Sequence, residues 1–421
     1  AYVMNQNAGA PIWSRGPMFP ELRGGNGVYL LKVTYHTKGY TFTSNYYYNA
    51  GDTYTVQVPA SASVSLSADA GTVNGRSYTM PSQNTSLTVT VDLPNMAQYT
   101  TYPNESVYVI TDRAGFTAMA TAVNGGKTLS GKSIYMICDV NMNGEAHTPI
   151  GRFVSDSSWT KSFSGTFYGN NYKVYNLKVN NTSLNGGGLF GSSYKATFVG
   201  LHIFNGSVTT ANRAGGITGY SDGCTFRYCS NGADIKTTTG SDGAGGLAGV
   251  ARASSRFEYC ANYGTVTATV KAAAGIAGWG QTNITLTGCI NTGVITAGTD
   301  AAAMARVGSG YSKTWPECYY LKSACSTSVA GTARDENYFC TGIVGGSINT
   351  ASRSTANNNA FTNTPRYPAI RTENDPSATC CRLYAYDDGL SIGYITVYAN
   401  VGDEVAETNA QDYYGDPAHT V

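Results

Sequence analysis

The segment Gly245-Gly246-Leu247-Ala248-Gly249 decides the fold, because close copies of it recur at nearly constant spacing. The copies lie at 187–191, 215–219, 245–249, 274–278 and, in degraded form, 302–306, so their starts are 28, 30, 29 and 28 residues apart. A period of this length predicts a solenoid in which one repeat forms one coil. The repeat glycines are Gly187, Gly188, Gly191, Gly215, Gly216, Gly219, Gly245, Gly246, Gly249, Gly275 and Gly278.

A second column of similar residues follows the glycine copies at a nearly fixed offset. Coils of a parallel β-helix stack about 4.8 Å apart, so residues at equivalent positions form inward-facing ladders. We expect buried free thiols in this column, with disulfides and a zinc site as the less favoured alternatives. The predicted structural ladder consists of Leu201, Cys229, Cys260, Cys289 and Cys318.

Three asparagines form a further column, each two residues after a ladder cysteine: Asn231, Asn262 and Asn291. Asparagine tolerates left-handed backbone better than most residues, and its amide can hydrogen-bond to the next copy. We therefore expect these residues to stack at a corner of the coil, in left-handed conformation, and to hydrogen-bond along the ladder.

The predicted fold class is all-β: a right-handed parallel β-helix with coils of about 29 residues, a small N-terminal antiparallel β domain and a C-terminal β segment. Alternating apolar residues and turn signals at 49–52 and 74–75 predict the N-terminal domain, and the apolar spacing over 111–123 predicts a short helix that caps the solenoid. The predicted divisions are an arm at 1–26, a sandwich-like module at 27–93, a linker at 94–106, the β-helix at 107–370 and a strand segment with tail at 371–421.

Composition points to an extracellular all-β protein. Charged residues make up 13% of the chain, against about 25% in an average protein, while Gly (50) and Tyr (32) are abundant. The net charge of +1 gives no electrostatic reason to expect a nucleic acid or an anionic membrane as partner. No apolar stretch is long enough for a membrane helix, and the start at Ala1 suggests a mature, processed or fragmentary chain.

The sequence shows no recognisable catalytic set. Glycan-cleaving β-helices need acidic and basic groups on one face, but four aspartates lie at different offsets in their repeats, so we expect solvated turn residues. These are Asp222, Asp234, Asp242 and Asp300. The histidines (His36, His147, His202 and His419) lack metal-binding spacing, and no orienting base lies near a serine or cysteine in the sequence. We expect no catalytic residue, cofactor or metal.

Several phrases resemble a known family. The glycine copies, followed by Tyr228-Cys229-Ser230-Asn231-Gly232 and by the similar segment at 259–266, look like the GLUG motif repeats of bacterial surface proteins. The segments 148–151 and 163–171 are similar to phrases that open such domains, and 70–81 resembles small Ig-like or internalin-B-type modules. The resemblance implies a β-helix in a secreted or cell-surface protein, often adhesin-like.

These observations predict a non-enzymatic extracellular scaffold, adhesin-like or a subunit of a surface fibre. The alternatives are a β-helical polysaccharide lyase or glycoside hydrolase, and a phage tail or receptor-binding fibre. Expected partners are neighbouring subunits, with host or environmental glycans or proteins as further candidates. Terminal segments would make the subunit contacts, and the candidate assembly residues are Trp13, Leu390, Ile392, Ile395 and Val397.

Overall fold

The computed structural model describes residues 28–308 except 241 and 282, then 315–325, 330–335 and the single residues Phe339, Val344 and Ile348. Backbone alone is described for four short strands, β1 (Trp13–Arg15), β2 (Pro20–Leu22), β39 (Phe361–Asn363) and β40 (Pro368–Ile370). The chain divides into an N-terminal unit, Ala1–Ala122 with Gly131–Val140, and a solenoid unit, Val123–Ser130 with Asn141–Val421.

Residues 28–94 of the N-terminal unit form two small sheets. One has the order β4-β3-β9-β6 and the other β5-β8-β7. All their pairings are antiparallel except that of β3 with β9, which is parallel. Alternate residues of β3 and β9, such as Leu31, Val33 and Val89, are fully buried, as the alternating pattern predicts. The strands are β3 (Val28–Lys38), β4 (Tyr40–Asn49), β5 (Thr53–Thr55), β6 (Val64–Ala68), β7 (Thr72–Asn74), β8 (Ser77–Thr79) and β9 (Thr85–Pro94).

The segment predicted as a linker, 94–106, contains the short 3-10 helix η1 (Met96–Gln98), in which Met96 is fully buried. Strand β10 (Val107–Ile110) then pairs in parallel with β11 (Ser133–Met136), and β12 covers Val140–Asn141. Between β10 and β11 lies the predicted helix, α2 (Arg113–Asn124). It begins after Asp112, whose Oδ1 accepts a hydrogen bond from the Gly115 amide at 3.3 Å.

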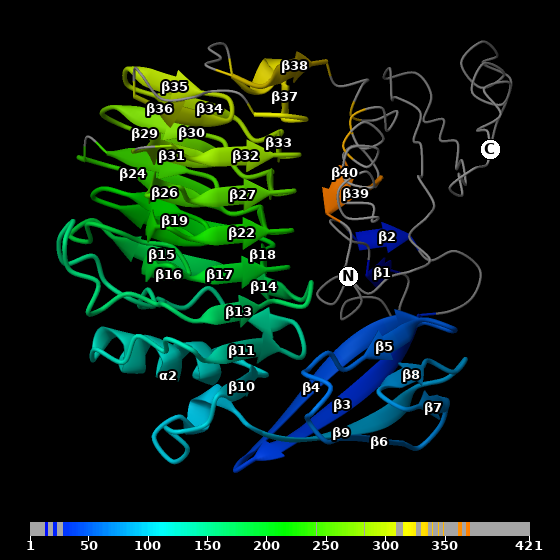
Figure 1. Ribbon diagram of the computed structural model, residues 1–421. Coiled ribbons are helices and arrows are strands. Elements are labelled where there is room, and N and C mark those ends of the chain that lie inside the picture. Colours follow the sequence, from blue (N-terminus) through cyan, green and yellow to red (C-terminus); the bar gives the residue numbers. More distant parts are fainter. Residues whose placement is uncertain are drawn as a thin grey trace, which may run out of the picture. The chain divides into compact units, whose positions relative to one another are not determined.

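The solenoid unit is a parallel β-helix with about 29 residues per coil, which confirms the predicted all-β fold class. The predicted C-terminal segment, 371–421, lies outside the described residues. Successive coils form the layers visible in Figure 1, and equivalent strands pair in parallel from coil to coil. In order, the sheets are β13 (Thr166–Tyr168), β17 (Thr197–Val199), β22 (Thr225–Arg227), β27 (Arg256–Glu258), β32 (Thr285–Thr287); β14 (Lys173–Tyr175), β18 (His202–Ile203), β23 (Ser230–Asn231), β28 (Ala261–Asn262), β33 (Ile290–Asn291), β37 (Tyr319–Leu321), β38 (Thr332–Arg334); β15 (Leu177–Asn181), β19 (Gly206–Thr210), β24 (Asp234–Thr237), β29 (Val266–Ala268), β34 (Ile295–Ala297); β16 (Phe190–Tyr194), β21 (Thr218–Asp222), β26 (Ala248–Arg252), β31 (Ala277–Gly280), β36 (Ala305–Val307); and β20 (Ala214–Gly215), β25 (Gly243–Gly245), β30 (Ala272–Ala274), β35 (Asp300–Ala302). A second short 3-10 helix, η2 (Lys322–Ala324), follows β37.

The cysteine column lies inside the coils. Leu201, Cys229, Cys260, Cys289 and Cys318 are each at most 1% exposed, and the backbone carbonyl of each accepts a hydrogen bond from the next coil. The four cysteines are free thiols. Burial raises the pKa of Cys260 and Cys318 well above the usual range, so these thiols stay protonated.

A column of stacked phenylalanines, which was not predicted from the sequence, runs parallel to the cysteines. Phe198 stacks on Phe226 with centroids 5.0 Å apart and rings 12° from parallel, and Phe226 stacks on Phe257 at 4.7 Å and 4°. Each such pair contributes about 0.5–1.5 kcal/mol beyond the area it buries. Register places Phe167 before and Leu286 after these rings, so the column follows the coil period.

The asparagine column confirms the predicted hydrogen-bonded ladder. Asn231 Nδ2 donates to Asn262 Oδ1 at 2.9 Å, and Asn262 Nδ2 donates to Asn291 Oδ1 at 2.8 Å. The three side chains are fully buried. Repeat glycines pack against them: a Cβ at Gly246 would lie 2.4 Å from the Asn262 amide carbon and 2.1 Å from the Gly275 carbonyl oxygen. This close approach, rather than left-handed backbone, explains the glycine at that position.

The expectation of left-handed backbone at the asparagines is wrong. The left-handed residues lie three positions earlier, immediately before the buried column, where φ is 54° at Tyr228, 55° at Tyr259, 58° at Gly288 and 52° at Glu317. The chain turns the corner there, so the asparagines remain in ordinary strand conformation at the ends of β23, β28 and β33.

The ladder predicts a large effect of Asn262→Ala on stability. The substitution leaves the Asn231 Nδ2 and Asn291 Oδ1 groups without their ladder partner in a buried site. We expect the free energy of unfolding, measured by urea denaturation, to fall by about 2–3 kcal/mol. The matched control is Asn283→Ala at an exposed position, which should change it by less than about 0.5 kcal/mol. Equal effects of the two substitutions would contradict the role of the ladder.

Candidate functional site

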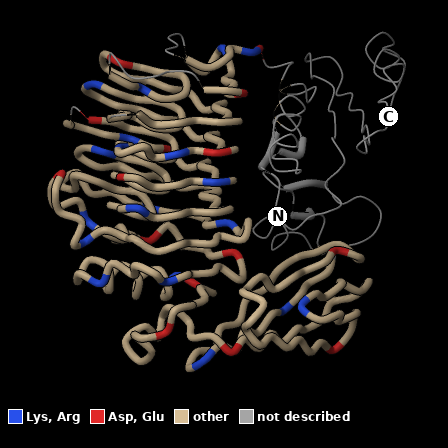
Figure 2. Tube along the Cα trace, in the orientation of Figure 1, with Lys and Arg blue, Asp and Glu red and all other residues tan. Residues whose placement is uncertain are grey.

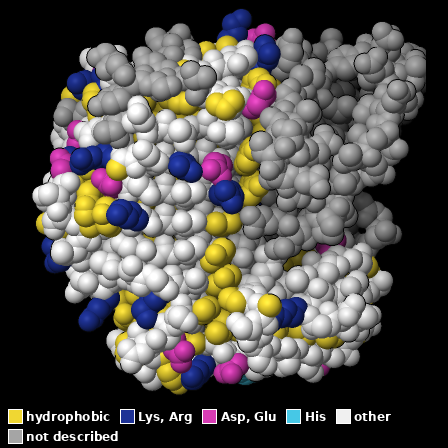
Figure 3. Space-filling model, viewed as in Figure 1, with side chains coloured by type: hydrophobic (Ala, Val, Ile, Leu, Met, Phe, Trp, Pro, Cys, Tyr) yellow, Lys and Arg dark blue, Asp and Glu magenta, His cyan; other side chains and the backbone are white. Residues whose placement is uncertain are grey.

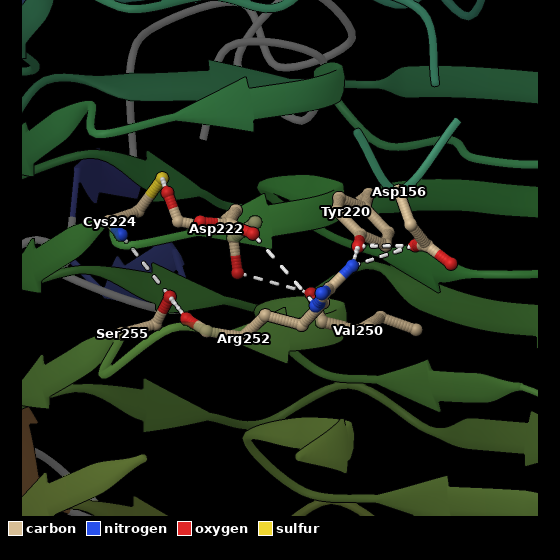
Figure 4. A network of polar contacts seen from close by, with 8 residues as sticks. Asp156, Tyr220, Asp222, Cys224, Val250, Arg252 and Ser255 are labelled. Carbon is tan, nitrogen blue, oxygen red and sulfur yellow. Dashed lines mark hydrogen bonds and ion pairs between the residues drawn. The ribbon is translucent and has the colours of Figure 1, made fainter. Parts of the chain in front are cut away.

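A polar and aromatic cluster lies where the 151–162 loop meets strands β21 and β26. Register pairs Asp222 of β21 with Arg252 of β26, and Tyr220 with Val250. Two of these side chains, Tyr220 and Arg252, therefore lie on neighbouring coils and converge on one loop residue, Asp156, as Figure 4 shows.

Hydrogen bonds connect the three residues into one network. Tyr220 donates its hydroxyl proton to Asp156 Oδ1 at 2.7 Å. Arg252 Nη1 donates to the Tyr220 hydroxyl oxygen at 2.6 Å and to Asp156 Oδ1 at 2.8 Å. On its other side, Arg252 Nε lies 3.9 Å from Asp222 Oδ2. One arginine thus links a loop carboxylate to a carboxylate of the sheet.

Aromatic contacts hold the same loop on the sheet. The Phe153 and Tyr220 rings are 4.7 Å apart. Trp159 stacks on Tyr194 of β16 at 4.8 Å with the rings 5° from parallel, and it lies 5.6 Å from Tyr220. The base of the loop is closed by a 2.7 Å hydrogen bond from the Arg152 amide to the Lys161 carbonyl. The loop is therefore fixed from both sides of its tip.

Arginine–aspartate pairs extend the cluster to neighbouring coils. Arg213 lies 4.2 Å above the Phe153 ring and makes a 2.6 Å ion pair with Asp242. Further along the stack, Arg306 pairs with Asp300 at 3.1 Å and lies over the Trp279 ring. The interpretation of Asp222 as a solvated turn residue is wrong, because Asp222 is buried in strand β21 and lies beside Arg252 of the next coil. Asp242 and Asp300 are half-buried, and each makes an ion pair with an arginine. Asp234 is exposed, as expected.

The pKa shifts in the cluster favour a role in holding the 151–162 loop in place over a role in proton transfer. Burial raises the pKa of Tyr220 above its usual range, so the hydroxyl remains a proton donor to Asp156. Burial also raises the pKa of Asp222, although Arg252 opposes this. Burial lowers the pKa of Arg252, but the hydrogen bond to Tyr220 and the charges of Tyr220, Asp156 and Asp222 together outweigh it, so the net shift is upward. The network stabilises a charged arginine between two carboxylates.

The tip of the loop faces solvent. The side chain of Asp156 is 63% exposed and Val154 is 46% exposed, and the neighbouring Ser157 and Thr160 are also exposed. Beyond the loop, the corner after β21 is fixed by Ser255, whose hydroxyl accepts from the Cys224 amide at 3.2 Å and donates to the Arg252 carbonyl at 2.7 Å. The cluster thus combines a fixed base with an accessible, hydroxyl-rich tip.

The predicted assembly residues Leu390, Ile392, Ile395 and Val397 lie outside the described residues, and Trp13 is described only as backbone of β1. Sequence reasoning missed Asp156, Tyr220 and Arg252. Asp156 and Tyr220 are 64 residues apart in the sequence, and Tyr220 and Arg252 are 32 apart. Only the rule that residues one coil apart are neighbours in space could have brought them together in a prediction. Among the described residues, no group of three or more histidines, cysteines or acidic residues is placed to hold a metal.

Charged residues of both signs are interspersed in the view of Figure 2. Figure 2 shows lysine, arginine and acidic residues spread along the coils, and Figure 3 shows hydrophobic side chains gathered in a stripe along the stack. None of the described helices is long and apolar enough to cross a membrane.

Comparison with known proteins gives little further guidance. No protein-family model matches the chain. No curated protein matches it either. A solved structure from Bacteroides ovatus, a "putative immunoglobulin A1 protease", is similar at 18% identity and a TM-score of 0.40, over 63% of this chain and 93% of that one. A likeness this distant carries no argument about activity.

The network predicts that Arg252→Met frees the 151–162 loop. The change removes the bonds to Asp156 and Tyr220 and leaves Asp222 without its partner, so loop opening should become easier by about 2 kcal/mol. Trypsin cleavage after Arg152 and Lys161, followed by mass spectrometry, should accelerate at least about tenfold.

Arg227→Met provides the matched control. Arg227 makes an ion pair of similar length with Glu258, at 2.7 Å, and lies on β22, in a different sheet from β21 and β26. This variant should leave cleavage after Arg152 and Lys161 unchanged. Equal cleavage in the wild type and both variants would show that the network does not hold the loop.

Proposed function

We propose that this protein is an extracellular, adhesin-like scaffold whose β-helix presents the 151–162 loop to a binding partner. The observation that carries the proposal is the contrast within that loop. Its base is fixed by Tyr220, Arg252 and the Trp159–Tyr194 stack, while its tip is open to solvent. A loop held in one conformation loses less entropy on binding than a free one.

The coil stack supports a presenting role because its ladders run through successive coils. The stacked phenylalanines and the asparagine ladder join the middle coils by side-chain contacts in addition to backbone hydrogen bonds. Such a stack resists bending and twisting, since any distortion would break several contacts in register. A stiff solenoid keeps its surface loops at fixed spacing.

Composition supports the extracellular setting and the class of partner. The chain is rich in Gly and Tyr and poor in charge, with a net charge of +1. The exposed hydroxyls and the carboxylate of the loop tip can donate and accept hydrogen bonds, as a glycan or a protein surface requires. We therefore propose host or environmental glycans or proteins as partners.

A carbohydrate-cleaving enzyme is the second candidate, and one observation favours it. Asp156 and Asp222 meet Arg252 and Tyr220 on one side of the coils, which is the kind of grouping such chemistry needs. Against it, each carboxylate interacts with the same arginine, and Tyr220 holds its proton. The scaffold is preferred because the network leaves no unpaired acid and base.

The experiment compares binding of the full chain and two variants to an array of glycans and extracellular host proteins. In Val154→Glu, a charge replaces an exposed apolar side chain of the loop tip. We expect wild-type binding to at least one class of arrayed molecule, weakened at least about tenfold by Val154→Glu because a central contact of the interface is lost.

Val294→Glu is the control, because Val294 is similarly exposed, at 52%, and lies before β34 on a different sheet. It should bind as the wild type does. Wild-type binding that survives Val154→Glu would place the interface elsewhere. Shortening of arrayed glycans by the wild type would favour the enzyme instead.

A further inference from the structure

Strand β4 of the N-terminal unit is an edge strand with one long side open. It pairs with β3 on one side, and none of the other described strands pairs with its far side. With ten residues it is the longest edge of the two sheets in 28–94, because β6 has five residues and β5 and β7 have three each. A long edge of this kind is a template for a further strand.

One hydrogen bond shows which backbone groups of β4 point outward. The Asn49 amide donates to the side-chain oxygen Oδ2 of Asp52 at 2.8 Å, so it does not point into the ladder with β3. In an antiparallel ladder the direction of the backbone groups alternates along the strand. The odd-numbered residues of β4 therefore direct their N–H and C=O groups away from β3. Three of them are exposed: Thr41, Thr43 and Asn45.

The outward backbone groups of these three residues bond to no other described part of the chain. The side-chain hydroxyls of Thr41 and Thr43 lie 3.1 Å from His36 Nδ1 and from the Thr34 hydroxyl oxygen, both on β3. These side chains thus lean back over the sheet instead of covering its edge.

The sequence of β4 lacks the features that protect natural edge strands. No charged residue and no proline occurs in 40–49, and the pairing with β3 contains no bulge. Natural proteins use lysine, proline, bulges or short strands to prevent the pairing of one sheet edge with another. The absence of all four at β4 favours a partner strand over solvent.

The two faces of β4 restrict how a partner strand can pair with it. Phe42 stacks on the buried Tyr35 with ring centroids 6.5 Å apart, and the Tyr35 hydroxyl donates to the Tyr46 hydroxyl oxygen at 3.4 Å. The even-numbered residues therefore face the packed side of the sheet and the odd-numbered residues face solvent. A two-fold axis perpendicular to the sheet keeps like faces of two copies on the same side.

We propose that β4 joins two copies of this chain by antiparallel pairing, an interaction beyond the partner binding of the 151–162 loop. With the axis at Thr43, that residue lies opposite the partner's Thr43, and Thr41 lies opposite the partner's Asn45. Each of these opposed pairs exchanges two backbone hydrogen bonds, so the outward groups of all three residues are satisfied. Thr–Thr pairs across strands also stabilise a sheet, and no like charges meet.

Sedimentation velocity of the full chain tests the proposal over a hundredfold concentration range centred on about 10 μM, where a small interface of this kind is expected to dissociate. We expect a monomer that converts to a dimer as the concentration rises. Hydrogen exchange of the 41–45 amides should slow at least about tenfold in the dimer. A wild type that stays monomeric would overturn the proposal and leave the edge to a strand of another protein.

Two charge variants test the register. Thr43→Lys and Thr43→Glu each place like charges opposite one another at the axis, so each should dimerise at least about tenfold more weakly than the wild type. An equimolar mixture of the two should recover the dimer, because opposite charges then meet. Failure of the mixture to dimerise would overturn the pairing centred on Thr43.

Thr90→Lys is the matched control, because Thr90 is exposed on the same sheet but lies on the inner strand β9. It should dimerise as the wild type does, and circular dichroism checks that each variant is folded. A dimer that survives Thr43→Lys unchanged would place the interface elsewhere and overturn the proposal. These readouts measure self-association, so they are independent of the binding array that tests the scaffold.

Discussion

Parallel backbone hydrogen bonding between coils is the constraint on which the rest of this structure depends. It fixes which residue lies beside which one coil later, and so turns a period of about 29 residues into columns along the stack. Each column requires a particular kind of contact. Phe226 stacks on another ring, Asn262 hydrogen-bonds to another amide, and Gly246 leaves room for the close approach of the neighbouring backbone. A change at one position is therefore felt by the neighbours above and below, but hardly elsewhere.

The same constraint explains what could be predicted from the sequence. The glycine copies and the asparagine spacing predicted a parallel β-helix and a hydrogen-bonded ladder, because both repeat at the coil period. The left-handed corner was misplaced, since Tyr228 and Tyr259 occupy it with ordinary side chains that carry no turn signal. The propensity of asparagine for left-handed backbone suggested that asparagine would occupy the corner. The stacking of the coils instead imposes this conformation on residues that do not favour it.

The functional clusters could not be predicted because their members do not repeat. Asp156, Tyr220 and Arg252 occur once each, and only the register brings them to a common point. The same holds for His202 and Ser230, which hydrogen-bond across neighbouring coils although they lie 28 residues apart in the sequence. In a solenoid, distance along the chain is a poor measure of proximity unless it is counted in coils.

The asparagine ladder also has a direction and two ends. Each amide donates toward the coil that follows, so the dipoles align head to tail and strengthen one another. Register places Ile203 before the first asparagine and Tyr320 after the last, and neither side chain can continue the series. Cooperative strengthening is thus confined to the middle of the stack. Amide hydrogens there should exchange with solvent more slowly than those of the outer coils. Local stability should therefore decrease from the middle of the stack toward its ends, where opening begins.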